Sequence, residues 1–252
     1  MPVVPAYQDF FEFLEKKEEY TDSWELFLKI YVEPHKKFLL NLWKEQGWLN
    51  IENLKRRVVK LKKEDYALLM LLTKYYDVQE EAEKVLKRCV EISKEVEPQF
   101  YIFVDQGSPD GVVVETERRH YIPGVNIDRW RDFFYLDVMV AHTFAHWLQK
   151  KAGMGKKTLK DLLLLEGEAV IFSKKVIPEA PIHKIVFLPE ESYRKLKSQE
   201  IKVALEIAPH LNKPIEEAAR ELSGKIEVMP WKYYMGYLAY TKPHLFGGLK
   251  QL

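Results

Sequence analysis

The stretch His142-Thr143-Phe144-Ala145-His146, followed after nineteen residues by Glu166-Gly167-Glu168-Ala169, decides how this chain of 252 residues is interpreted. Two histidines four positions apart on a helix project from one face, where both imidazoles can bind one metal ion. The glutamate falls on a second predicted helix, and its carboxylate can complete a three-ligand site that keeps a fourth position for water. The sequence therefore predicts a metal centre at His142, His146 and Glu166.

The predicted helix that carries the two histidines is apolar nearly all round from Leu136 to Leu148, which indicates a buried helix. Buried imidazoles need polar partners, because an unsatisfied buried polar group costs about 1–3 kcal/mol. A metal ion is one such partner. The alternative is a pair of core histidines bonded to carbonyls or carboxylates beside a helix-borne acid. With seven histidines in the chain, the pair alone is weak evidence, and the spacing to Glu166 strengthens it.

Composition places the chain among globular proteins, with 47% hydrophobic and 31% charged residues. A net charge of +1 provides no field that attracts nucleic acid or an anionic membrane, and no apolar run reaches membrane-spanning length. The N-terminal residues lack a secretory signal pattern, and the single Cys89 has no disulfide partner within the chain. We therefore expect a soluble cytoplasmic protein. Its charges are mainly Lys and Glu, a bias typical of thermophilic proteins.

Hydrophobic periodicity predicts one α+β domain over residues 1–252 in which helix predominates. Residues 1–97 form an N-terminal helical part, residues 98–127 a small sheet of two or three strands, and residues 128–252 the metal-site helices and a C-terminal helical part. The basic run at 55–63 has ordinary amphipathic spacing, so we interpret it as a solvated helix face rather than a nucleic-acid site.

Local signals within these parts predict where individual helices begin and end. Asp22 and Ser23 cap a long helix that extends to about residue 46, and Asn126 or Asp128 caps the helix that ends near Lys151. Residues 157–175, 190–210, 214–222 and 230–240 are predicted to be helical, and residues 178–189 to be irregular.

The metal-ligand pattern resembles the gluzincin arrangement, the thermolysin-like branch of zinc metallopeptidases. More closely, the chain is similar to a bacterial family of predicted zinc-dependent proteases whose core reads H-E-x-x-H and then E-G-x-A. The similarity extends to the helix at 22–37, to the strands and turn at 101–127, and to Trp231 with Gly236-Tyr237. This resemblance implies a zincin-like fold with a small sheet before the metal-binding helix, and zinc as the cofactor.

Two positions depart from the pattern of that family. Thr143 stands where the family has the glutamate that takes a proton from the metal-bound water, and losing such a base typically costs about 10²–10⁴ in rate. Val170 stands where thermolysin-like sites often place a carboxylate that orients a histidine. The resemblance thus implies a metal-binding protein with impaired or absent peptidase activity. The first alternative is a metal-free pseudopeptidase that binds a peptide, small ligand or partner protein; the second is a hydrolase active on an undemanding substrate.

Other polar side chains are candidates for supporting roles. Tyr237 is our candidate oxyanion donor, with Tyr234 and His244 as alternatives; the competing interpretation places the tyrosines in an aromatic core. Glu115 or Glu117 is an alternative base on the strand region that borders a zincin cleft. Three further residues are expected to lie away from the metal: Glu168, turned roughly 200° from Glu166 on the helix, Asp137 and His120. The sequence leaves the oligomeric state open.

Overall fold

The computed structural model describes residues 3–47, 50–128, 130, 132–223 and 231–247. The chain divides into two units, residues 1–143 and 144–252, and the division falls inside helix α7 (Leu136–Lys151). The predicted α+β class with predominant helix is confirmed, whereas the zincin-like fold and the single domain stay predictions.

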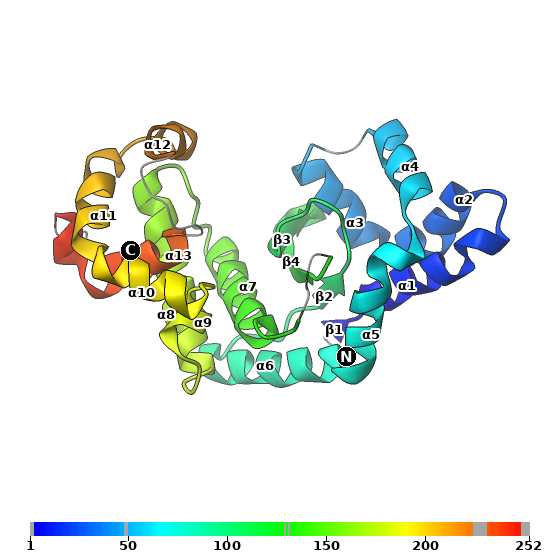
Figure 1. The fold of residues 1–252 in the computed structure, drawn as a ribbon, viewed down its shortest axis with the longest axis horizontal. Helices are drawn as coiled ribbons and strands as arrows, with labels where there is room; N and C mark the ends of the chain where they lie inside the picture. Colours follow the sequence, from blue (N-terminus) through cyan, green and yellow to red (C-terminus); the bar gives the residue numbers. More distant parts are fainter. Residues whose placement is uncertain (1–2, 48–49, 129, 131, 224–230, 248–252) are drawn as a thin grey trace. The chain divides into compact units, whose positions relative to one another are not determined.

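Helices make up most of the first unit (Figure 1). They are α1 (Ala6–Lys16), α2 (Ser23–Phe27), α3 (Glu33–Glu45), α4 (Ile51–Lys60), α5 (Ala67–Tyr75) and α6 (Val78–Ser93). The predicted cap at Asp22 is confirmed, since its carboxylate accepts hydrogen bonds from the backbone of Trp24 and Glu25. The long helix predicted after it is interrupted by a π-helical turn at Leu28–Val32 and by non-helical backbone at His35, directly after Pro34.

The described strands of this unit form one mixed sheet in the order β1-β2-β4-β3. They are β1 (Val3–Val4), β2 (Phe100–Phe103), β3 (Gly111–Thr116) and β4 (His120–Asn126). β2 lies parallel to β1 and β4, and β3 pairs antiparallel with β4 from Gly111 opposite Val125 to Thr116 opposite His120. The sequence predicted β2, β3 and β4 and missed β1, because two residues carry no periodicity. Helix α3 packs beside β3 (Figure 1).

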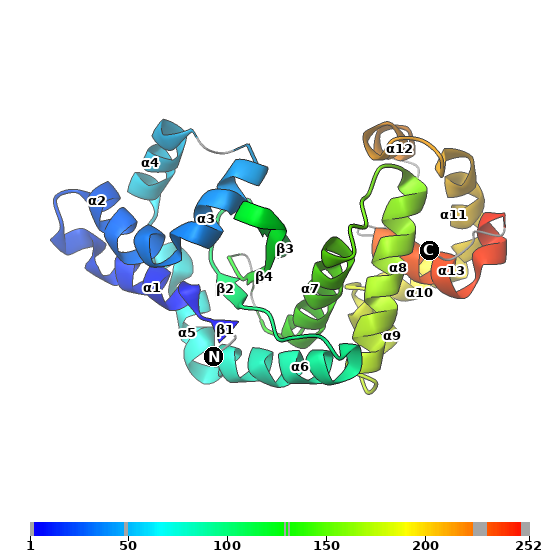
Figure 2. The same ribbon diagram turned by 180° about the vertical axis from the view of Figure 1, so that it is seen from behind.

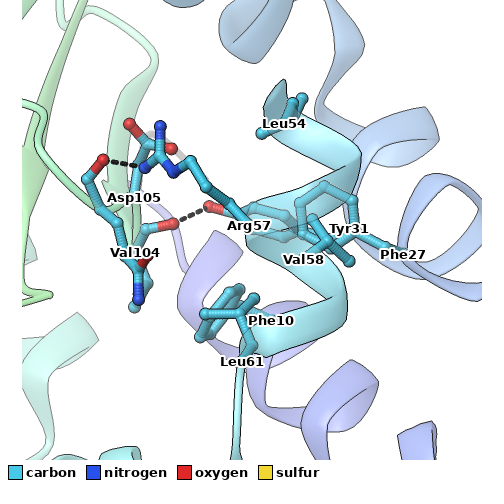
Figure 3. A pocket seen from close by; sticks show the side chains of 10 residues that line it. Phe10, Phe27, Tyr31, Leu54, Arg57, Val58, Leu61, Val104 and Asp105 are labelled. Carbon is cyan, nitrogen blue, oxygen red and sulfur yellow. Dashed lines mark hydrogen bonds between the residues drawn. The ribbon is translucent and has the colours of Figure 1, made fainter. Parts of the chain in front are cut away.

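The turn after β2 holds a buried carboxyl group. Asp105 accepts hydrogen bonds from Trp43 Nε1, at 3.2 Å, and from the Ser108 hydroxyl. Burial raises the pKa of Asp105 to about 6, and the hydrogen bonds and the charge of Arg57 offset only part of this effect. Figure 3 shows the Arg57 guanidinium beside Asp105, where it donates to the Gln106 carbonyl at the edge of a cavity of about 20 Å³.

The predicted cap of the histidine-bearing helix is wrong, because α7 begins only at Leu136. The amide of Asn126 is already committed to the turn: its Oδ1 accepts from the Asp105 backbone at 3.0 Å and its Nδ2 donates to the Asp105 carbonyl at 2.8 Å. The Asp128 carboxylate accepts from the Tyr66 hydroxyl at 2.9 Å. Both side chains therefore stabilise the sheet and its turn rather than a helix terminus.

The second unit is helical throughout its described secondary structure apart from an isolated bridge between Thr158 and Pro214. Its helices are α8 (Leu159–Val176), α9 (Ile182–Ile185), α10 (Glu190–Ser198), α11 (Glu200–Ile207), α12 (Ile215–Leu222) and α13 (Trp231–Thr241). Thr158 and Asp161 form a capping box that starts α8. The segment predicted to be irregular contains the short α9, and the helix predicted over 190–210 is broken at Gln199.

Helices α8 and α13 cross in backbone contact (Figure 2). A Cβ atom added to Gly167 would lie 2.2 Å from the Gly236 carbonyl oxygen, and one added to Gly236 would lie 2.7 Å from the Leu163 carbonyl oxygen. Glycine is therefore required at both positions of the crossing. Because Gly167 follows Glu166 directly, this crossing brings the first turn of α13 to the predicted metal ligand. Among the described helices, none is long and apolar enough to cross a membrane.

Candidate metal centre

The three predicted ligands come together. His142 and His146 lie one turn apart on α7, Glu166 lies on α8, and one nitrogen or oxygen atom from each falls within 4.8 Å of the others. His142 is 3% exposed and Glu166 1%, and His146 is partly exposed. A tetrahedral zinc site with bonds of 2.0–2.2 Å separates its ligand atoms by about 3.4 Å, and the limit of 4.8 Å on this group is compatible with such a site.

The structure identifies the residue that orients His146. Its Nδ1 lies 2.7 Å from Gln149 Oε1. The Gln149 amide nitrogen donates to the Leu165 carbonyl and to a Glu168 carboxylate oxygen, each at 2.8 Å, so its oxygen must face the imidazole. Gln149 Oε1 therefore accepts from the Nδ1–H of His146, and Nε2 of the same ring faces Glu166 Oε2, 3.3 Å away. Gln149 thus contacts the imidazole that the resemblance would pair with a carboxylate at position 170, where the buried Val170 stands.

Two lysines approach the other oxygen of the same carboxylate. Lys156 Nζ, from the loop before α8, lies 2.9 Å from Glu166 Oε1, and Lys232 Nζ, from α13, lies 3.5 Å from that oxygen. Burial lowers the pKa of Lys232, but the charge of Glu166 and the contacts with Tyr233 outweigh it and hold this pKa above its ordinary value. Both ammonium groups thus approach the same oxygen of the buried Glu166 side chain.

Thr143 directly follows the first predicted ligand, His142, where the resemblance would place a base. It is 1% exposed, and among the described residues its hydroxyl oxygen has no hydrogen-bond partner. A Cβ atom on Gly111, the first residue of β3, would lie 2.6 Å from this oxygen, so the strand approaches the Thr143 side chain closely. A hydroxyl in this position can hydrogen-bond a neighbour but does not hold a proton taken from water at neutral pH.

The alternative bases lie elsewhere. Glu115 is exposed and four residues beyond Gly111, about 13 Å along the strand, and the exposed Glu117 follows the end of β3. Glu168 reaches the site through Gln149, in agreement with its predicted position away from the metal. His120 is exposed at the start of β4, and Asp137 lies in the first turn of α7, where it accepts from the Val138 backbone.

The candidate oxyanion donor, Tyr237, receives no support from the described contacts. Tyr237 stacks on Tyr234 with 6.3 Å between ring centroids, and the Tyr234 hydroxyl donates to Glu200 at 3.0 Å. On α13, Tyr237 lies roughly 140° around the axis from Lys232, which faces Glu166. His244 is exposed in a 3₁₀ turn after α13. The aromatic-core interpretation accounts for Tyr234, and the role of Tyr237 stays a prediction.

Comparisons with protein-family models, with curated proteins and with solved structures find no match for this chain. The resemblance to zinc-dependent proteases therefore stays a prediction.

Proposed function

We propose that this chain is a zincin-like protein that binds one divalent metal ion, zinc foremost, through His142, His146 and Glu166, and that hydrolyses peptides poorly or not at all. The observation that carries the proposal is the pair formed by His146 Nε2 and Glu166 Oε2. These two atoms are both hydrogen-bond acceptors when Gln149 holds the imidazole proton on Nδ1, yet they lie 3.3 Å apart. Two acceptors this close repel each other, and a cation between them, either a metal ion or a proton, removes the repulsion. The nearby imidazole of His142 favours the metal ion.

The residues around the ion define what the site can do. A bound zinc ion acts as a Lewis acid and lowers the pKa of its water. Gln149 fixes the orientation of His146, and the two lysines place positive charge beside Glu166. Thr143 contributes no proton acceptor, so the site retains its metal ligands and lacks the group that would move protons during peptide hydrolysis.

Metal analysis tests the binding half of the proposal. Protein purified without added zinc and then dialysed against zinc should contain one ion per chain, and His146→Ala should lose it. His120→Ala is the matched control, because His120 is an exposed histidine of the sheet and should leave metal content unchanged. Absence of bound metal in the wild type after zinc addition would contradict the proposal.

A gain-of-function variant tests the catalytic half. Thr143→Glu should create or greatly raise chelator-sensitive cleavage of a broad peptide library, since it restores a proton acceptor beside the metal. Thr143→Gln has the same size without the carboxylate and should stay inactive. If Thr143→Glu binds zinc and remains inactive, the peptidase-like geometry is wrong.

A metal-free pseudopeptidase is the second candidate. It is favoured by Lys156, whose ammonium group already neutralises Glu166 at 2.9 Å. In that case the chain uses the site to bind a peptide or a partner protein, and the wild type takes up no zinc.

A further inference from the structure

We infer that Lys156 and Lys232 compete with the metal ion for Glu166 and give the site a stable metal-free state, so that metal occupancy follows metal supply. This inference rests on the proposed function and concerns the regulation of the same site.

The charged groups around Glu166 approach its two carboxylate oxygens differently. Its side chain is 2% exposed, and a carboxylate buried to this degree without partners is strongly disfavoured. Lys156 and Lys232 both approach Oε1, while Oε2 faces His146. The lysines thus satisfy the carboxylate through one oxygen, and the metal would bind it through the other.

The side chains of Lys156 and Lys232 are both partly exposed to solvent. The Lys156 side chain is 34% exposed and extends from the loop between α7 and α8, and the Lys232 side chain is 39% exposed. Each stem is long and flexible, so an ammonium group repelled by an arriving cation can move into solvent. Glu166 itself is fixed on α8 beside the Gly167–Gly236 crossing and cannot follow.

A bound metal ion would change the net charge of the groups around Glu166. A divalent ion beside Glu166 and two lysines leaves these groups with an excess of three positive charges. The two positions at which the zinc-protease pattern has acids carry Thr143 and Val170 in this chain, so neither adds a negative charge. Glu168 is joined to the site through the Gln149 amide. Like charges within a few ångströms repel each other, so the metal-loaded state loses the stabilisation that the lysines provide to the metal-free state.

The test measures zinc affinity and metal-free stability in the same variants. Lys156→Met should tighten zinc binding roughly 10-fold or more, because the Lys156 ammonium group no longer competes with zinc for Glu166. The same variant should lower the Tm of the metal-free protein, because Glu166 loses a neutralising charge. Lys232→Met should act in the same direction with a smaller effect, in keeping with its longer distance of 3.5 Å. Lys156→Arg keeps the charge and should stay close to the wild type.

Lys157→Met is the matched control, since it removes a neighbouring exposed charge from the same loop. Zinc affinity that is unchanged or weaker in folded Lys156→Met overturns the inference while leaving the proposed function intact. Zinc binding by Lys156→Met alone would show that Lys156 excludes zinc from the wild type, which overturns both the supply-dependent occupancy and the proposed function. If neither protein binds zinc, both the inference and the proposed function are wrong.

Discussion

Asp105 in the first unit and Glu166 in the second are both buried carboxyl groups, but their partners differ in kind. Asp105 accepts hydrogen bonds from an indole and a hydroxyl, with one guanidinium nearby, and burial raises its pKa to about 6. Glu166 meets two ammonium groups and an imidazole whose other nitrogen is held by Gln149. At Asp105, hydrogen bonds and one nearby guanidinium accompany an acid that stabilises a turn. At Glu166, cationic partners and an oriented histidine accompany an acid that could bind a metal ion.

Removing each negative charge should separate the two roles most clearly. Glu166→Gln should weaken zinc binding by about 100-fold or more, because a neutral amide oxygen replaces a carboxylate ligand. Asp105→Asn should leave zinc affinity within about twofold, since it removes a charge from the turn. Titration against a zinc-chelating dye measures both. Equal affinity in Glu166→Gln and the wild type would show that Glu166 is a structural acid like Asp105.

The glycine crossing that positions Glu166 should be the most sensitive packing contact of the second unit. Gly167→Ala should lower the free energy of unfolding by about 3 kcal/mol or more, at the upper end of overpacking effects, because its Cβ meets backbone atoms that cannot rotate away. Gly155→Ala is the control, as nothing lies within 4 Å of its added Cβ. Denaturant unfolding measures the free energy of unfolding of both variants. Similar values for the two would contradict the close backbone contact between α8 and α13.

Asp105 should give the first unit a pH-dependent stability. Its pKa rises from 3.8 in the unfolded chain to about 6 in the folded protein, so the folded state binds the proton more tightly. The contribution is fully present below about pH 4 and is lost as pH rises through 6, by about 3 kcal/mol in all. Compared with the wild type, Asp105→Asn should gain stability between pH 4.5 and pH 8. Urea unfolding measures both proteins across this pH range. If the difference between their free energies of unfolding stayed constant with pH, burial would not shift this pKa.

The smallest expected effect concerns the support of His146. Gln149→Leu should weaken zinc binding about 10- to 100-fold, the usual consequence of losing the partner of a metal-binding histidine. Gln149→Glu keeps an acceptor for Nδ1 and should weaken zinc binding less. Isothermal titration calorimetry distinguishes the two, and wild-type affinity in Gln149→Leu would mean that His146 is oriented by other contacts.

The three ligands could be predicted because helical period fixes which residues share a face, so the spacing from His142 to His146 specified their geometry. Gln149 carried a detectable signal as a polar residue three positions after His146 on an apolar helix, although it was not among the predicted site residues. Lys156 and Lys232 carried none. The first lies in a loop, and the second reaches Glu166 from 66 residues away through a helix crossing that no periodicity indicates.

The fold shows the same division between local and distant determinants. Runs of β-branched and aromatic residues next to turn residues predicted β2, β3 and β4, and capping residues predicted the start of α2. The two-residue β1 and the late start of α7 at Leu136 depend on tertiary partners, as the hydrogen bonds of Asn126 to the Asp105 backbone demonstrate.

Anomalous diffraction at the zinc edge, from crystals grown with zinc, tests the central claim most directly. We predict one anomalous peak with bonds of about 2.0–2.2 Å to nitrogen atoms of His142 and His146 and to Glu166 Oε2. Crystals that show no peak at these residues, with Lys156 still bonded to Glu166, would contradict the claim that this site binds metal.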